Sequence, residues 1–423
     1  MKTATHRHMR RLTVAALPLA LAMAAAQADV VTDWNIKANE IVIESKLGTP
    51  PAVRAMALVQ TAVNDAVREA AARPGTAMST EAAVAAANRA VLVKLLPAQQ
   101  TSIDAAYQAA LATIADGPAR TAGIAAGEKA AAAVLARRAG DVIAPDTWRP
   151  LVTPGVYVPT ATLAATQWPQ RTPWLMTGAA QFRPGPPPAL TSEAWASDVN
   201  EVRELGSRNS TRRTAEQTDI ARFWDYSLPA IYHGAVRSVA DQPGRDVARN
   251  ARLLAAVAQA MDDAMIAVFD AKYQYNLWRP VTAIRNGDLD GNDATPREAG
   301  WVSLIDAPMH PEYPSGHSIL AGAIGVVLKA DTAGTQPMLA TSSPTAKGAT
   351  RRWTSIDAFV TEIGESRIYG GIHYRTAIQV ANAMGEQIGA LAVERVLRKP
   401  DAMARLQPPA PRPLVEYGSH ASR

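Results

Sequence analysis

Apolar residues recur every three or four positions in several stretches of the chain, which is the pattern of amphipathic helices. The clearest case is residues 51–70, where a proline start precedes apolar positions on one side: Met56, Val59, Val63, Ala66 and Ala70. Alanine-rich stretches predict three further helices, over 81–95, 100–115 and 119–138. Their small side chains favour close helix packing. We find no convincing alternation with a period of two, so we expect no substantial sheet.

Composition divides the chain into five parts. The predicted parts are an export signal (1–28), an N-terminal helical bundle (29–139), a loop rich in Pro, Trp and Thr (140–190), a C-terminal helical bundle (191–398) and a Pro-rich tail (399–423). Structureless segments as long as the predicted loop are usually functional or cover another surface. We therefore predict an all-α fold of two packed helical bundles with a long connecting loop.

The first residues have the features of a cleaved export signal. Three arginines precede the apolar run from Leu12 to Ala26, and Ala26-Gln27-Ala28 is a small-x-small cleavage site. The mature chain would then begin near Asp29 and be periplasmic or secreted. The longest later apolar run, Ile319 to Leu328, is far short of the roughly 18 residues that a membrane span requires, so we expect no transmembrane segment in the mature chain.

Charge and cysteine content narrow the classes of protein further. The formal net charge of the full chain is +5, from 43 basic and 38 acidic residues. The predicted signal holds four of the basic residues and no acidic one, so its removal lowers the net charge to about +1. This balance does not favour a nucleic-acid partner, which needs a concentrated basic face. The chain has no cysteine, so its core must stabilise it without disulfides.

Three motifs in the second half contain the side chains that are most suited to binding or catalysis. They are Lys272-Tyr-Gln-Tyr-Asn-Leu-Trp-Arg279-Pro280, Pro314-Ser315-Gly316-His317 and Ser366-Arg367-Ile-Tyr-Gly-Gly-Ile-His373. Together they supply three cations, two imidazoles and a hydroxyl beside a glycine, which are groups that bind a tetrahedral oxyanion. Each motif alone also fits an ordinary structural role: a buried ion pair, a capping serine with a surface histidine, or a capping histidine with a surface arginine.

The order and spacing of the three motifs resemble the signature of the vanadium haloperoxidase and type 2 phosphatidic acid phosphatase superfamily. The stretches 50–54, 271–285 and 365–374 look like the exported bacterial members of its chloroperoxidase-like branch. The resemblance implies an all-helical, vanadium haloperoxidase-like fold dominated by two four-helix bundles. It places the oxyanion site in the second bundle.

The resemblance also implies a role for each motif residue. The oxygens of vanadate or phosphate would be held by five residues: Lys272, Arg279, Ser315, Gly316 and Arg367. His373 would be the axial group, bonded to vanadium in a peroxidase or attacking phosphorus in a phosphatase. His317 would be the acid-base residue at the opposite, apical oxygen.

Three functions are compatible with these roles. We favour an exported vanadate-dependent haloperoxidase that uses hydrogen peroxide to oxidise halide. The first alternative is a soluble acid phosphatase that cleaves phosphomonoesters through a phosphohistidine and requires no cofactor. The second alternative is a non-catalytic oxyanion-binding protein. The sequence does not predict an oligomeric state.

Two further positions refine the hypothesis. His310 stands five residues before Ser315, where chloroperoxidases of the family commonly have Phe and several bromoperoxidases have His, so the resemblance favours bromide. An ordinary loop role for His310 stays open. The family often places Asp four residues after the axial histidine, and here that position is Ala377. Another group, such as a backbone carbonyl, must then orient His373.

Overall fold

The computed structural model describes residues 29–72, 78–141, 148–149 and 151–398. The predicted export signal (1–28) and Pro-rich tail (399–423) lie outside the described residues. In the described part, helices account for nearly all regular structure, and one small two-stranded sheet accounts for the rest. The predicted all-α fold is confirmed.

The first part of the chain forms five helices: α1 (Val30–Glu44), α2 (Thr49–Ala71), α3 (Thr80–Leu95), α4 (Gln100–Ala112) and α5 (Pro118–Arg137). The last four coincide closely with the predicted ranges, whereas α1 was not predicted. Glycine permits the close approach of α3 and α5, because a Cβ at Gly127 would lie 2.2 Å from the carbonyl oxygen of Ala83. The small residues of these helices therefore do allow tight packing.

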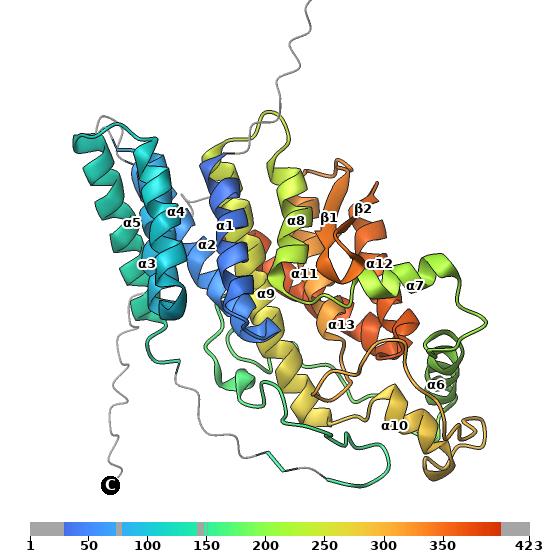
Figure 1. Ribbon diagram of the computed structural model, residues 1–423. Coiled ribbons are helices and arrows are strands. Elements are labelled where there is room, and N and C mark those ends of the chain that lie inside the picture. Colours follow the sequence, from blue (N-terminus) through green and yellow to red (C-terminus); the bar gives the residue numbers. More distant parts are fainter. Residues whose placement is uncertain (1–28, 73–77, 142–147, 150, 399–423) are drawn as a thin grey trace, which may run out of the picture.

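The long helix α9 (Val247–Tyr275) runs through the middle of the molecule, between the first helices and the later elements (Figure 1). It packs against α2 on one side and against α11 (Gly316–Asp331) and α13 (Arg375–Ala392) on the other. Residues from all four helices belong to one continuous apolar core. Helix α9 thus joins the two halves of the chain.

The other elements surround the second half of the molecule. The helices are α6 (Glu193–Leu205), α7 (Ala215–Phe223), α8 (Pro229–Ala240), α10 (Pro280–Arg285) and α12 (Ile356–Tyr369). Short 3₁₀ turns span Pro97–Gln99, Trp168–Gln170, Gly287–Leu289 and Pro344–Ala346, and a π-helical turn spans Val393–Leu397. Strands β1 (Leu339–Ser343) and β2 (Ala349–Trp353) pair antiparallel, with Leu339 opposite Trp353. No helix of the described residues is long and apolar enough to cross a membrane.

The Pro- and Trp-rich segment before α6 is fixed onto α9 by buried carboxylates. Asp263 accepts the backbone N–H groups of Trp174, Leu175 and Met176 at 2.6, 2.8 and 2.8 Å. The indole N–H of Trp174 donates to Asp262 at 2.6 Å. At Trp174, Leu175 and Met176 the segment is therefore held by polar contacts to α9.

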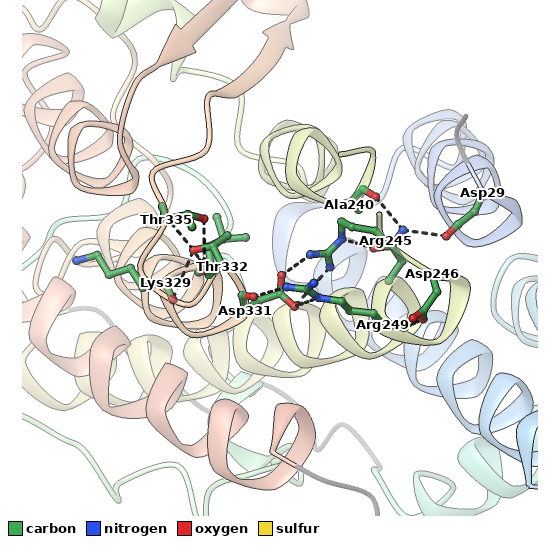
Figure 2. Close-up of polar contacts among 11 residues, drawn as sticks. Asp29, Ala240, Arg245, Asp246, Arg249, Lys329, Asp331, Thr332 and Thr335 are labelled. Carbon is green, nitrogen blue, oxygen red and sulfur yellow. Dashed lines mark hydrogen bonds and ion pairs between the residues drawn. The ribbon is translucent and has the colours of Figure 1, made fainter. Parts of the chain in front are cut away.

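Ends of several helices meet in a polar cluster, shown in Figure 2. Asp29 caps the start of α1, and its second carboxylate oxygen accepts the amide of Asn250 at 2.8 Å. Arg245, just before α9, donates to Asn250 and to Asp331 at the end of α11. These contacts fix the N-terminal ends of α1 and α9 against the C-terminal end of α11.

Candidate functional site

The first motif lies at the junction of α9 and α10. Lys272 is in the last turn of α9, which ends because Asn276 adopts a left-handed conformation (φ 52°) and its N–H donates to the Lys272 carbonyl at 2.8 Å. Arg279 is the N-cap of α10, and Pro280 is the first helical residue. The end of one helix and the start of the next therefore place the two cations.

The second motif opens α11. Ser315 is its N-cap, and the Ser315 hydroxyl oxygen accepts a hydrogen bond from the Ser318 hydroxyl at 3.0 Å. The Ser315 N–H donates to the Ala377 carbonyl at 3.1 Å, which ties the start of α11 to the first turn of α13. A Cβ built on Gly316 would meet no atom within 4 Å, so the backbone at this helix start borders open space.

The third motif spans the turn between α12 and α13. Arg367 lies in the last turn of α12, and Gly371 follows with φ 77°. A Cβ at Gly371 would lie 2.4 Å from the Gly206 carbonyl oxygen, so both the backbone conformation and the close approach require glycine. This bend places His373, which is 2% exposed, directly before α13.

The three motifs converge on one cavity of about 250 Å³. Its wall includes Lys272, Gly316, His317, Arg367 and His373, together with His310. Gly48, Thr49 and Pro50, at the start of α2, complete the wall from the first half of the chain. The remaining two predicted residues lie next to this wall: Arg279 contacts His310 and His373, and Ser315 precedes Gly316. The structure thus brings all the predicted residues together, and their roles stay predictions.

Among the described residues, the three buried cations of the site form no ion pair with a carboxylate. Lys272 Nζ donates to the carbonyls of Pro311 and Glu312 at 3.0 and 2.8 Å, and also to that of Pro314. Arg367 donates to the Trp224 carbonyl, and its Nε has no hydrogen-bond partner in the described part of the chain. Within the described residues, neither these two side chains nor Arg279 forms an ion pair.

Burial disfavours the charged form of these three side chains and therefore lowers their pKa values. Burial lowers the pKa of Arg279 and that of Arg367 to about 10 each, and it lowers the pKa of Lys272 well below its usual range. Uncompensated buried charge is strongly unfavourable, so a bound anion would stabilise this arrangement.

Arg279 connects two histidines of the site. Its Nη1 donates to the Ile372 carbonyl at 2.9 Å and lies 3.3 Å from His373 Nε2. Its Nε donates to the His310 carbonyl at 2.9 Å, and its Nη2 lies 2.9 Å from His310 Nδ1. Because a guanidinium group can only donate, both imidazole nitrogens act as acceptors.

Both predicted catalytic imidazoles are neutral. Burial, reinforced by Arg279, Lys272 and Arg367, lowers the pKa of His373 well below its usual range. Burial and the Arg367 charge likewise lower the pKa of His317. His317 Nε2 has no hydrogen-bond partner among the described residues. A neutral imidazole with an unpartnered nitrogen on a cavity wall is available for proton exchange.

Glu312 is a residue of this site that sequence reasoning missed. It is fully buried, and its Oε1 accepts His373 Nδ1 at 2.7 Å and the Tyr374 N–H at 3.0 Å. Burial raises the Glu312 pKa to about 8, against the opposing effect of Lys272 and Arg279. The backbone carbonyl suggested as the partner of His373 is therefore replaced by a carboxylate. The sequence shows an acidic residue two positions before the Pro-Ser-Gly-His motif, but not its burial.

The donors of the cavity fit a tetrahedral oxyanion such as vanadate or phosphate. Lys272 and Arg367 line the cavity and Arg279 lies beside it, none of them in an ion pair with a described residue, and Arg367 Nε and His317 Nε2 have no partner within the described chain. An oxyanion supplies several negatively charged oxygens that accept hydrogen bonds from such donors. Vanadate is the group that the sequence resemblance implies.

Comparison with known families finds a match for part of the second half of the chain. Residues 252–401 match the model of the VCPO second helical-bundle domain. Vanadium chloroperoxidase of Curvularia inaequalis is 31% identical over 143 residues, which are 27% of this chain and 23% of that protein. The alignment therefore spans about a quarter of the length of this curated relative.

Solved structures show the same fold over most of the chain. One described as the first bacterial vanadium-dependent iodoperoxidase is 25% identical, with a TM-score of 0.73, and the match covers 86% of this chain and 95% of that one. A bacterial vanadium-dependent chloroperoxidase in its holo form has a TM-score of 0.67 at 17% identity, covering 88% and 95% of the two chains. At that identity, the second likeness concerns the fold alone.

Proposed function

We propose that this chain, whose residues 252–401 match the model of the VCPO second helical-bundle domain, is a vanadate-dependent haloperoxidase that oxidises halide with hydrogen peroxide. The observation that carries the proposal is the set of three buried cations without ion pairs around the open space at Gly316. Vanadate, when bound, supplies a Lewis-acid centre that activates peroxide toward halide.

The side chains of the site have separate tasks in this proposal. Lys272, Arg279 and Arg367 neutralise the oxygens of the anion, with the Ser315 hydroxyl and the Gly316 N–H as further donors. His373 offers the lone pair of Nε2, because its Nδ1 is engaged by Glu312. His317 moves a proton to or from the peroxide through its unpartnered Nε2.

We propose bromide as the preferred halide. His310 lies in the cavity wall beside Arg279 and contacts Phe269 edge to face, with ring centroids 5.2 Å apart. Burial and the charges of Lys272 and Arg279 lower the His310 pKa well below its usual range, so the ring is neutral. The proposal rests on the family pattern at this position, with a neutral polar ring in place of phenylalanine.

Reconstitution with orthovanadate tests the activity and the halide separately. The protein is incubated with or without orthovanadate and assayed for peroxide-dependent halogenation of a phenolic dye in chloride, bromide or iodide. We expect turnover that requires vanadate and is most efficient with bromide. Halogenation with iodide but not with bromide would contradict the proposed halide and leave the proposed activity intact. Hydrolysis of a phosphomonoester with no halogenation in any halide would instead support the phosphatase alternative.

We also propose that the protein is exported. The support is the arginine-flanked apolar segment within residues 1–28 and its small-x-small site before Asp29. N-terminal sequencing of the protein recovered from separated periplasm and cytoplasm tests this. We expect a periplasmic form that begins near Asp29, and an uncleaved cytoplasmic form would contradict export.

A further inference from the structure

Two contacts on opposite sides of the His373 ring indicate the same tautomer. Arg279 Nη1 lies 3.3 Å from Nε2 and carries only donor hydrogens, so Nε2 must be the acceptor. Glu312 Oε1 accepts the Tyr374 N–H and lies 2.7 Å from Nδ1, so this oxygen acts as the acceptor of the ring N–H as well. The proton of the neutral ring therefore resides on Nδ1, and the lone pair of Nε2 points away from Glu312.

We infer that Glu312 is the positioning residue that holds His373 in its Nδ1–H tautomer and orients Nε2 for the bound oxyanion. In this chain it takes the place of a carboxylate in the first turn of α13, where Ala377 offers no polar side chain. The link to an oxyanion rests on the proposed function, whereas the tautomer itself does not depend on it.

The surroundings of Glu312 make it suitable for this task. The Tyr374 N–H donates to the same oxygen, Oε1, at 3.0 Å, so the residue after His373 also fixes the carboxylate. Both backbone groups of Glu312 are hydrogen-bonded. Its N–H donates to the Leu277 carbonyl at 2.9 Å, and its carbonyl accepts a hydrogen bond from Lys272 Nζ at 2.8 Å. Glu312 therefore connects the first and third motifs through the segment that precedes the second.

Nitrogen-15 NMR of histidine-labelled protein tests the tautomer without any cofactor. The His373 signals are assigned by their loss in His373→Gln. We expect the Nδ1 shift of a protonated ring nitrogen and the Nε2 shift of an unprotonated one. A ring protonated at Nε2 in the wild-type protein would overturn the inference.

A pair of variants tests whether Glu312 enforces the tautomer. Glu312→Gln is nearly isosteric, but its amide can both accept and donate, so it no longer dictates which nitrogen carries the proton. Asp290→Asn is a matched control: Asp290 is also buried and hydrogen-bonded, to Trp195 Nε1 at 2.9 Å and Thr295 Oγ1 at 2.7 Å, and it does not line the cavity.

We expect Glu312→Gln to introduce the Nε2–H tautomer at His373 and to weaken orthovanadate binding roughly 10- to 100-fold, as loss of a partner behind a ligand usually does. Asp290→Asn should change neither quantity, whatever it does to the melting temperature. If Glu312→Gln keeps the tautomer and binds orthovanadate within about twofold of wild type, the inference is wrong. If Glu312→Gln does not fold, Glu312→Ala, which also lacks the carboxylate, replaces it and the same two readouts decide.

These readouts separate the inference from the proposed function. Orthovanadate affinity is measured by calorimetry in the absence of peroxide and halide, and the tautomer is read from the free protein. A protein that shows the predicted tautomer and its loss in Glu312→Gln, but no halogenation, would retain the inference and lose the proposed function. Halogenation with an Nε2-protonated His373 would do the reverse.

Discussion

The two imidazoles of the site are the same side chain in different surroundings. His373 has both nitrogens engaged, by Glu312 and by Arg279, whereas Nε2 of His317 has no partner in the described part of the chain. A nitrogen fixed by neighbours is suited to hold a ligand, and an unpartnered nitrogen on the cavity wall is suited to exchange a proton. The two positions should therefore respond differently to substitution.

For His317→Ala we expect a decrease in halogenation turnover of roughly 10²- to 10⁴-fold, the usual contribution of a general acid-base residue. Orthovanadate affinity should change little, because the buried cations are untouched. His373→Ala is the contrasting variant and should weaken orthovanadate binding itself. Steady-state kinetics and calorimetry measure both. If His317→Ala retains wild-type turnover, His317 is not the acid-base residue. If the wild-type protein binds orthovanadate but shows no turnover, the protein is a non-catalytic oxyanion-binding protein.

Motif spacing predicted which cations and imidazoles meet, because all five side chains are at or next to helix ends that the motifs themselves define. Glu312 could not be predicted in the same way. Glutamate is ordinarily exposed, and nothing in the local pattern indicates that this one is fully buried. Its burial depends on the contacts with Tyr374 and His373, which are about sixty residues away in sequence.

At the scale of elements, helix periodicity was predictable where apolar residues alone fill the buried face. It failed for α1, whose buried positions include Thr32, Asn35 and Asn39. Asn35 and Asn39 each contact His233 Nδ1 at 3.1 Å, so polar residues complete this face and break the apolar pattern. The hairpin of β1 and β2 was missed because each strand has only five residues, and in β2 only Trp353 is buried.

The connection of the Trp-rich segment to α9 gives a prediction with a definite pH dependence. Burial raises the pKa of Asp263 from 3.8 to about 6. The folded state then binds this proton more tightly than the unfolded state, so the contribution of Asp263 to stability is greatest below about pH 4 and is lost as pH rises through about 6. The slope between these values is on the order of 1.4 kcal/mol per pH unit.

Asp263→Asn removes this titration, so the free energy lost in the variant should be larger at pH 4.5 than at pH 7. Urea unfolding of both proteins at the two pH values measures the difference. Asp290→Asn serves as the control for the loss of a buried carboxylate elsewhere. An equal loss for Asp263→Asn at both pH values would contradict the prediction.

At the scale of the whole molecule, Arg54 links elements that are distant in sequence. It lies on α2, forms ion pairs with Asp262 on α9 and with Asp141 beyond α5, and lies 5.5 Å from the ring of Trp174. Its side chain is only 7% exposed. Together with the continuous apolar core around α9, this contact indicates that both halves of the described chain unfold as one unit.

Arg54→Met tests this cooperativity. The variant leaves the buried carboxylate of Asp262 without its cation, which should reduce the free energy of unfolding by about 3–5 kcal/mol. The double variant Arg54→Met/Asp262→Asn should recover part of the loss, because neither partner then remains as an unpaired charge. Native-state hydrogen exchange follows the amides of α3, in the first half, and of α12, in the second. Because α9 belongs to the core of both halves, the free energy of exchange should fall by the same amount for the most protected amides of α3 and of α12. A decrease confined to α3 would show that the halves unfold independently.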